Sequence, residues 1–352
     1  MIKKLLFSLL YIIPLISCTK DNYKIDVACK LMPNGTYMIK WETFPPMEGR
    51  VKIYESAHPD SFNLYSPIAE LNIKEGYKTI LGMPNITRSY FKLVFNKKYS
   101  VITSDRVIPM ERIFNFRDIG GYTNKEGRYI QWGKLYRSGS LGMANRKDMA
   151  TLDKLGIETI IDLRTQRESY NFPNKYKAPQ IYNLPLRGNR YDIFFNEILS
   201  EKMKRTDILS YDQSIFSFII ENNSDYFIKM FDILLDEKNY PVVIYCSLGK
   251  DRTAIASALI LAALDTENDF ILDDYLMSNE LIDYHALVRN AEHYPEMVQE
   301  TITALFSAHR ETIIKSMETL TSQYGSMDNY FEKELDLTPR KREKLKDILL
   351  YN

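Results

Sequence analysis

The feature that most constrains this chain is a cysteine followed six residues later by an arginine, between a predicted strand and a predicted helix. A β-branched run, residues 242–244, ends just before Cys246, and a five-residue loop leads to Arg252 and to a helix rich in small residues, 254–263. Gly249 permits the backbone angles of a tight loop. Successive amides in such a loop point inward and attract an anion, and the helix N-terminus adds partial positive charge. The pattern therefore predicts a phosphate site with a cysteine at its base.

Two interpretations of Cys246 fit its position at a strand end. Free cysteine is often buried in a core, and a packing role is the plain alternative. Arg252 favours the chemical role, because its planar fork suits two phosphate oxygens and its charge favours the thiolate, the form that attacks. We therefore interpret the segment as a site for phosphate-monoester chemistry.

The segment resembles the signature loop of the cysteine-dependent protein-tyrosine phosphatases. The match is with the bacterial tyrosine/serine phosphatase branch, whose loop usually reads H-C-x-x-G-K-D-R-T-G. Further blocks that look like this branch follow the same order in the chain: residues 115–122, 135–139, 161–165 with Glu168, and 274–278. The resemblance runs from about residue 111 to the C-terminus. It implies a metal-independent phosphomonoesterase without a cofactor, and the chain has no H-x-x-x-H or clustered Cys/His pattern.

The resemblance implies a role for each residue of the loop. Cys246 would be the nucleophile that takes the phosphoryl group as a thiophosphate, and Arg252 would bind its equatorial oxygens. Asp251 would be the general acid for the leaving group and then the base for the hydrolytic water. Lys250 would add positive charge beside the phosphate, and Thr253 would hydrogen-bond the thiolate. The phosphate-binding set is Ser247, Leu248, Gly249, Lys250 and Thr253.

The matched blocks outside the loop contain four charged residues with supporting roles: Arg117, Asp118, Asp162 and Arg164. Asp162 is the second candidate for the general acid. Its alternative role is a salt bridge to Arg117 or Arg164, and we favour the salt bridge.

The loop departs from the family pattern at three positions. Tyr245 replaces the usual His, Ala254 replaces the usual Gly, and Leu248 replaces a smaller residue. The usual His helps to orient the loop, so its replacement leaves weaker or substrate-restricted activity as an alternative. No reacting group is lost, and the sequence predicts an active enzyme.

The N-terminus has the layout of an export signal. Lys3 and Lys4 precede an apolar stretch, residues 5–16, which is shorter than the roughly 20 residues that span a membrane. The stretch ends in Ser17-Cys18, which resembles the bacterial lipobox, where the cysteine is lipidated. We predict a signal peptide at 1–17, a lipid-anchored linker at 18–21, and a membrane-anchored lipoprotein at the periplasmic face or the cell surface. An ordinary signal peptide is the alternative.

The number of cysteines argues against a disulfide-stabilised fold, and the net charge argues against a nucleic-acid-binding protein. With Cys18 lipidated and Cys246 catalytic, Cys29 cannot form a disulfide without consuming the nucleophile, so the fold depends on its apolar core. Lys plus Arg and Asp plus Glu both total 46, which gives no basic field for nucleic acid. The sequence gives no indication of the oligomeric state.

Two domains follow the signal segment. Residues 22–109 contain short β-type runs between turn signals, which predict a β-sandwich of fibronectin-III or immunoglobulin type, as a spacer or a docking unit. Residues 110–352 alternate strands and helices, which predicts an α/β phosphatase domain with a central, mostly parallel sheet flanked by helices. The β-type runs of the first domain are 36–41, 51–54, 77–81, 90–95 and 99–108. In the second domain we expect a strand at 158–163. We expect helices there at 146–155, from residue 224, at 268–279, at 296–324 with a possible break, and from residue 338. Residues 187–211 lack a clear period and are interpreted as a lid or a surface loop.

Three functions agree with these observations. The first is a protein-tyrosine or dual tyrosine/serine phosphatase, acting on a phosphorylated protein or a small phosphorylated substrate. The second is a phosphoinositide or inositol-phosphate phosphatase, since Lys250 would place a second cation in the cradle. The third is a non-catalytic, phosphate-binding pseudophosphatase, which Tyr245 motivates.

Overall fold

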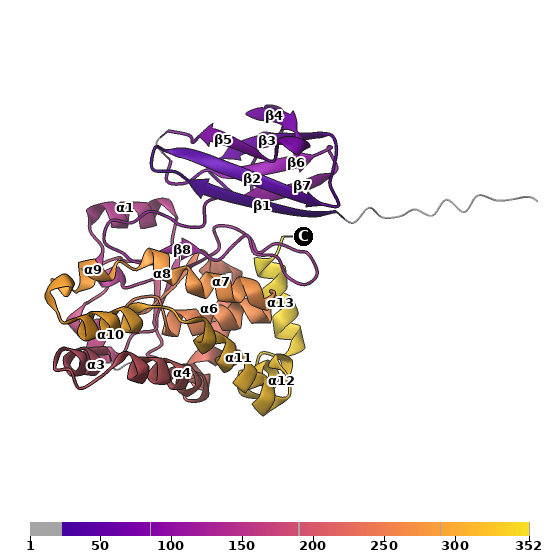
Figure 1. Ribbon diagram of the computed structural model, residues 1–352. Coiled ribbons are helices and arrows are strands. Elements are labelled where there is room, and N and C mark those ends of the chain that lie inside the picture. Colours follow the sequence, from indigo (N-terminus) through magenta and orange to yellow (C-terminus); the bar gives the residue numbers. More distant parts are fainter. Residues whose placement is uncertain (1–22, 85, 189–190, 289, 352) are drawn as a thin grey trace, which may run out of the picture.

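The computed structural model describes residues 23–351 apart from residues 85, 189–190 and 289. Two antiparallel sheets formed by residues 24–103 lie against a larger α/β unit, and β1 and the C-terminal end of the chain lie near the junction (Figure 1). The predicted signal peptide, residues 1–17, lies outside the described residues, as do Cys18 and the linker at 18–21. No helix among the described residues is both long and apolar enough to span a bilayer.

The two antiparallel sheets share one apolar core. Their strands are β1 (Lys24–Leu31), β2 (Thr36–Phe44) and β5 (Tyr77–Leu81) in one sheet, and β4 (Ala69–Asn72), β3 (Arg50–Ser56), β6 (Tyr90–Phe95) and β7 (Tyr99–Thr103) in the other. Ile39 and Trp41 of the first sheet pack in the same cluster as Val51, Phe91 and Phe95 of the second. Alternate residues of β2 are buried, as expected for a strand with one face on a core. The fibronectin-III or immunoglobulin assignment stays a prediction.

The central sheet of the α/β unit has the order β11, β10, β12, β9, β8. The first four strands are parallel and β8 is antiparallel, which confirms the mostly parallel sheet. Their bounds are β8 (Arg117–Asp118), β9 (Leu135–Ser138), β10 (Thr159–Asp162), β11 (Gln180–Asn183) and β12 (Val242–Tyr245). The predicted phosphate loop follows β12, so it lies at the edge where the parallel strands end, where α/β folds bind ligands.

Helices flank this sheet, and α6 leaves the phosphate loop directly (Figure 1). They are α1 (Arg146–Lys154), α2 (Gln166–Asn171), α3 (Tyr191–Leu199), α4 (Arg205–Glu221), α5 (Ser224–Leu234), α6 (Arg252–Ala263), α7 (Asn268–Leu276), α8 (Ser278–Leu281), α9 (Tyr284–Leu287), α10 (Glu296–Phe306), α11 (Arg310–Tyr324), α12 (Met327–Glu334) and α13 (Pro339–Leu349). All residues of α6 except Ala262 are buried, because its small side chains let the neighbouring elements approach closely.

The interpretation of residues 187–211 as a lid or loop is wrong in its secondary structure. The segment contains α3 and the beginning of α4, and Phe194, Ile198 and Ile208 are buried in a cluster with residues of α10. Phe194 and Ile198 are one helical turn apart, but the charged residues around them hide this period in the sequence. The predicted helix at 296–324 is broken between α10 and α11.

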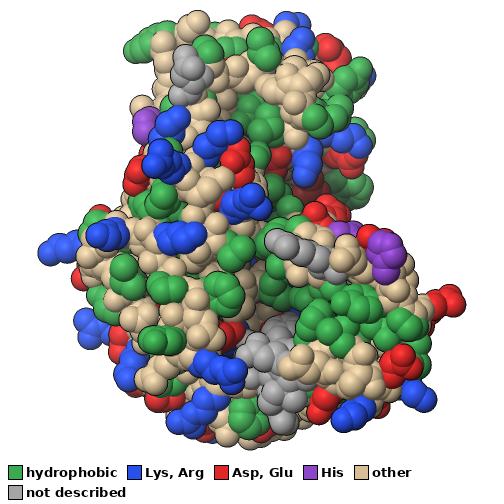
Figure 2. Space-filling model, turned by 90° about the vertical axis from the view of Figure 1, so that its left-hand side faces the viewer, with side chains coloured by type: hydrophobic (Ala, Val, Ile, Leu, Met, Phe, Trp, Pro, Cys, Tyr) green, Lys and Arg blue, Asp and Glu red, His purple; other side chains and the backbone are tan. Residues whose placement is uncertain are grey.

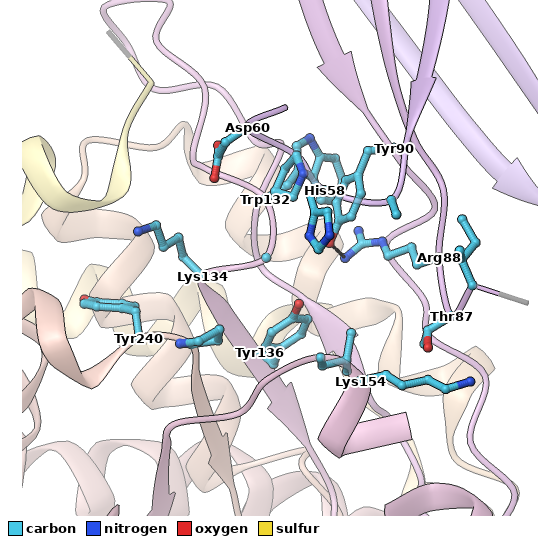
Figure 3. Close-up of a pocket in the computed structure, with 16 residues that line it drawn as sticks. His58, Asp60, Thr87, Arg88, Tyr90, Trp132, Lys134, Tyr136, Lys154 and Tyr240 are labelled. Atoms are coloured by element: carbon cyan, nitrogen blue, oxygen red, sulfur yellow. Dashed lines mark hydrogen bonds between the residues drawn. The ribbon is translucent and has the colours of Figure 1, made fainter. Parts of the chain in front are cut away.

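A buried ion pair joins the two parts of the molecule. Arg88, which precedes β6, donates from Nη1 to Asp118 Oδ2 at 2.6 Å and from Nε to Ser104 Oγ at 2.7 Å. Its guanidinium lies over the rings of Tyr90 and Trp132. Figure 3 shows Arg88, Tyr90 and Trp132 together at a cavity of about 440 Å³ between the two parts. The sheets are thus attached to the α/β unit by specific buried contacts as well as by the chain.

Candidate active site

The backbone of the loop from Cys246 to Arg252 is held from outside by donors to its carbonyl groups. The carbonyl of Ser247 accepts from Ser140 N at 3.0 Å, and Asn115 Nδ2 donates to the carbonyls of Leu248 and Gly249 at 3.2 and 3.0 Å. In a trans peptide unit the N–H points opposite to the C=O. Outward carbonyls therefore turn the next amides toward the inside of the loop, an arrangement that suits a bound anion.

Gly249 is required at its position for two reasons. Its φ is +70°, where a side chain is strained, and a Cβ atom would lie 2.4 Å from the carbonyl oxygen of Ser138. Arg137 Nη2 also donates to the carbonyl of Gly249, at 2.7 Å. The loop thus packs directly against the end of β9.

Cys246, Arg252 and Glu168 meet at the base of this loop. Cys246 and Arg252 are buried, and Glu168 from α2 accepts two hydrogen bonds from Arg252, 2.7 Å from Nη1 to Oε2 and 2.8 Å from Nη2 to Oε1. Ser247 Oγ also donates to Glu168. Arg252 also donates from Nη1 to the carbonyl of Leu163 at 3.3 Å and from Nη2 to Ser247 Oγ at 3.4 Å. No hydrogen bond to another described residue uses Nε, so this N–H is available to a bound oxyanion.

The charges of this group support one another. Burial acts to raise the pKa of Glu168. The hydrogen bonds and the charge of Arg252, together with hydrogen bonds from Ser247 and Thr165, outweigh burial and bring this pKa well below its ordinary value. Burial likewise acts to lower the pKa of Arg252, and the neighbouring Glu168 and Cys246 bring it above the ordinary value. The pair is therefore fully ionised at neutral pH, and Arg252 provides a fixed positive charge beside Cys246.

Tyr245, in place of the family's His, belongs to a buried network with Asp162 and Arg164. Its hydroxyl donates to Asp162 Oδ2 at 2.6 Å and accepts from Arg164 Nη2 at 3.0 Å. Arg164 also pairs with Asp162, 2.8 Å from Nη2 to Oδ2. Burial and the charge of Asp162 raise the pKa of Tyr245, so the phenol keeps its proton. Of the two partners predicted for Asp162, the structure places Arg164 beside it.

Arg117 belongs to a second buried network, with Arg137 and Asp274. Arg117 Nε lies 3.1 Å from Asp274 Oδ1, and Arg137 pairs with Asp274 Oδ2. Burial lowers the pKa of Arg117 to about 10, and the charge of Arg137 acts in the same direction. Arg117 also donates to the side chain of Asn115, so this network supports the two groups that hold the carbonyl of Gly249.

Lys250 does not lie beside the phosphate cradle as predicted. Its side chain is buried and donates from Nζ to the carbonyls of Leu305 and Ser307 at the end of α10, at 2.7 and 2.9 Å. Carbonyls at a helix C-terminus carry partial negative charge and attract an ammonium group. Asp251, next in the loop, has an oxygen 3.5 Å from Lys250 Nζ.

Thr253 does not make the predicted bond to the thiolate in this structure. Its hydroxyl is buried and has no hydrogen-bond partner among the described residues. Asp118 is also away from the loop, since its carboxylate accepts from Arg88, Gly133 N and Gly120 N.

Sequence reasoning gave no role to Glu168, although it lies in a matched block. The segment from Thr165 to Glu168 has the spacing of a helix capping box, and the structure forms one: Thr165 N donates to Glu168 Oε2 at 2.8 Å. This signal predicts where α2 begins and therefore that Glu168 faces its first turn. Asn115, Arg137 and Asp274 were also left without roles, because only the fold brings them to the loop.

The model of the tyrosine phosphatase family matches residues 108–351, more than half of the chain. The chain belongs to this family. The match covers the phosphate loop, the Arg252–Glu168 pair and every charged residue of the two buried networks described above.

Two curated relatives of this tyrosine phosphatase agree with the family. A Cupriavidus necator protein named "Putative tyrosine-protein phosphatase" is 27% identical over 243 residues, 65% of this chain and 84% of the relative. The Mycobacterium tuberculosis protein named "Triple specificity protein phosphatase PtpB" is 24% identical over 272 residues, 67% of this chain and 96% of the relative. Among solved structures, the core catalytic domain of the PP-IP phosphatase SIW14 from S. cerevisiae covers 56% of this chain and 86% of its own, with 19% identity and a TM-score of 0.28.

The tyrosine phosphatase site opens into a cavity of about 610 Å³ beside the loop. Ser247 and Leu248 form part of its wall, together with residues of the α2 end, α3, α9 and the end of α10. Figure 2 shows the face that carries α1, α9 and α10, where hydrophobic side chains gather around a hollow. Apolar side chains thus make up much of the surface beside the loop.

Proposed function

We propose that this tyrosine phosphatase hydrolyses phosphate monoesters through a phosphocysteine at Cys246. The observation that carries the proposal is the two-bond contact of Arg252 with Glu168, beside Cys246 and under a loop whose carbonyls point outward. The amides and the Nε–H of Arg252 suit the equatorial oxygens of a transferring phosphoryl group, and both are fixed before substrate arrives.

The reaction proceeds in two displacements. The Cys246 thiolate attacks phosphorus, a sulfur–phosphorus bond forms, and the bond to the ester oxygen breaks, with Asp251 as the group that gives the leaving oxygen its proton. A water molecule then attacks the same phosphorus and loses its proton to Asp251, and the sulfur–phosphorus bond breaks. Inorganic phosphate leaves and the thiolate is restored. The position of Asp251 at the start of α6, within the loop, supports this role.

The proposed substrate is phosphotyrosine in a protein, with phosphoserine as a second substrate. The case for inositol phosphates rested on Lys250 as an extra cation in the cradle, and that ammonium group is bound to the carbonyls of Leu305 and Ser307. The apolar wall beside the loop favours an aromatic ester over a ring that carries several phosphates. The case for a pseudophosphatase rested on Tyr245, whose hydroxyl bonds to Asp162 and Arg164. This network leaves Cys246, Asp251 and Arg252 in place, so the replacement of His by Tyr245 removes no reacting group.

A substrate panel tests this proposal. We expect kcat/KM for a phosphotyrosine peptide to exceed that for inositol hexakisphosphate by at least about 100-fold, since several bound charges would lose hydration against an apolar wall. A phosphoserine peptide of the same sequence should be intermediate. Malachite green measurement of released phosphate compares all three on one enzyme preparation. Equal or faster release from inositol hexakisphosphate would contradict the choice of substrate, and no release from any of them would favour the pseudophosphatase.

We further propose that the enzyme is exported and anchored through lipid on Cys18. The basic start, the short apolar stretch and Ser17-Cys18 support this. Labelled palmitate should enter the full chain, and Cys18→Ala should abolish the label and release the protein from the membrane fraction. A membrane-bound, unlabelled wild type would contradict lipidation.

A further inference from the structure

The cavity beside the phosphate loop is larger than a phosphoryl group requires. It extends from Ser247 and Leu248 to Phe195 on α3 and Leu287 on α9. Its volume of about 610 Å³ lies within the range of ligand-binding pockets, about 300–1,000 Å³. A phosphoryl group in the loop occupies only one end of this space, so the other end is available to the rest of the substrate.

Two buried cations, Arg164 and Lys250, bind the backbone of residues that line the cavity. Arg164 donates from Nη1 to the carbonyl of Phe172 at 2.6 Å and to Ser140 Oγ at 3.0 Å. Lys250 donates to the carbonyls of Leu305 and Ser307, which fixes the end of α10. These parts of the lining are therefore positioned relative to the loop by buried, charge-assisted hydrogen bonds.

The lining of the cavity is chiefly apolar. Phe172 and Met143 have exposed fractions of 58% and 42%, although each is a large hydrophobic residue. Three charged residues belong to the lining: Glu168 is paired with Arg252, Arg164 is paired with Asp162, and Arg167 is an exposed residue of α2. Exposed apolar side chains that line a concave surface next to a reaction centre indicate binding of an apolar group.

The rim of the same cavity carries two side-chain amides, Asn171 and Asn196. Both are exposed. A carboxamide donates and accepts, so these residues suit the N–H and C=O groups of an extended peptide. An extended peptide advances about 3.3 Å per residue. Side chains one to three positions from a phosphotyrosine are therefore within reach of the apolar wall.

We propose that this cavity is a specificity pocket for a large apolar side chain close to the phosphotyrosine of a protein substrate. The inference rests on the proposed function, because it takes phosphotyrosine as the reacting group. Burial of a leucine or phenylalanine side chain there favours binding, and an acidic side chain in the same place loses its hydration. Lys250 and Arg164 act as positioning residues for the walls of this pocket.

Matched phosphotyrosine peptides test the pocket. Four peptides carry either three leucines or three aspartates, on the N-terminal or the C-terminal side of the phosphotyrosine, with all other residues alike. We expect kcat/KM to be at least tenfold higher for leucine than for aspartate on one of the two sides. In Leu287→Ala and Phe195→Ala this ratio should fall at least threefold. In Tyr65→Ala, which changes a fully exposed residue of the connection between β3 and β4, it should stay as in wild type. The ratio is measured within one preparation, so a loss of folded enzyme does not change it.

The outcomes separate the inference from the function on which it depends. Equal rates for leucine and aspartate on both sides, with all four peptides hydrolysed, would overturn the pocket and leave the proposed function intact. Hydrolysis of para-nitrophenyl phosphate without hydrolysis of any peptide would overturn the proposed protein substrate. Faster release from a phosphate ester on a long alkyl chain than from the leucine peptides would assign the pocket to lipid and overturn the inference.

Discussion

Cys246→Ser is expected to lower kcat/KM for para-nitrophenyl phosphate by more than about 10⁴-fold. A serine hydroxyl is a much weaker nucleophile toward phosphorus than a cysteine sulfur, so the first displacement should become very slow. The substitution changes one atom, and Arg252 keeps its two bonds to Glu168. Binding of inorganic phosphate, measured by calorimetry, should therefore remain within a few-fold of wild type.

Cys29→Ser is the matched control for this prediction. Cys29 lies in β1, is half-buried, and packs against the core of the N-terminal sheets. Its replacement should leave turnover near that of wild type. If Cys246→Ser kept a substantial share of the wild-type rate, or if both serine variants lost activity to the same extent, Cys246 would not be the attacking group.

Arg88→Met should lower the free energy of unfolding by about 3–5 kcal/mol, because it leaves the buried charge of Asp118 without its partner. Both side chains are almost completely inaccessible to solvent. Asp118 belongs to β8, and successive side chains of a strand point to opposite faces. Arg117, on the other face, supports the phosphate loop, so the loss should also lower activity. Urea unfolding followed by circular dichroism measures the change in stability.

Arg50→Met is the control for the ion pair. Arg50 pairs with Glu70 on the surface of the same sheets, with side-chain exposed fractions of 60% and 38%, and exposed pairs of this kind contribute little to stability. Adding Asp118→Asn to Arg88→Met should recover part of the lost stability, since it removes the stranded charge. Equal small effects of Arg88→Met and Arg50→Met would show that the buried pair does not hold the two parts together.

The elements of the fold follow closely from local sequence patterns. The runs at 77–81 and 90–95 form β5 and β6 with the same bounds, because both are rich in β-branched and aromatic residues and lie between turn signals. β4, with four residues, is too short to carry such a pattern and was not predicted. In α3 the apolar residues are arranged for contact with α10, and that partner is not visible in the local sequence.

The site shows the same limit between local and long-range information. The loop after β12 was predicted because its strand, glycine, arginine and helix are contiguous. The orientation of the Lys250 side chain was not predicted, because its acceptors, the carbonyls of Leu305 and Ser307, are more than fifty residues away in the chain. The partner of Asp118 could not be predicted either, since Arg88 lies between β5 and β6, in the N-terminal part of the chain that the family match does not cover.

The most direct test of the phosphocysteine is to trap it in Asp251→Asn. Para-nitrophenolate leaves without needing a proton, so the first displacement should proceed, while hydrolysis lacks its base and becomes slow. Acid quenching after one turnover and mass spectrometry of the digested protein should find phosphate on the peptide that contains Cys246. Release of para-nitrophenolate with no phosphate on that peptide, or with phosphate on another residue, would contradict the account.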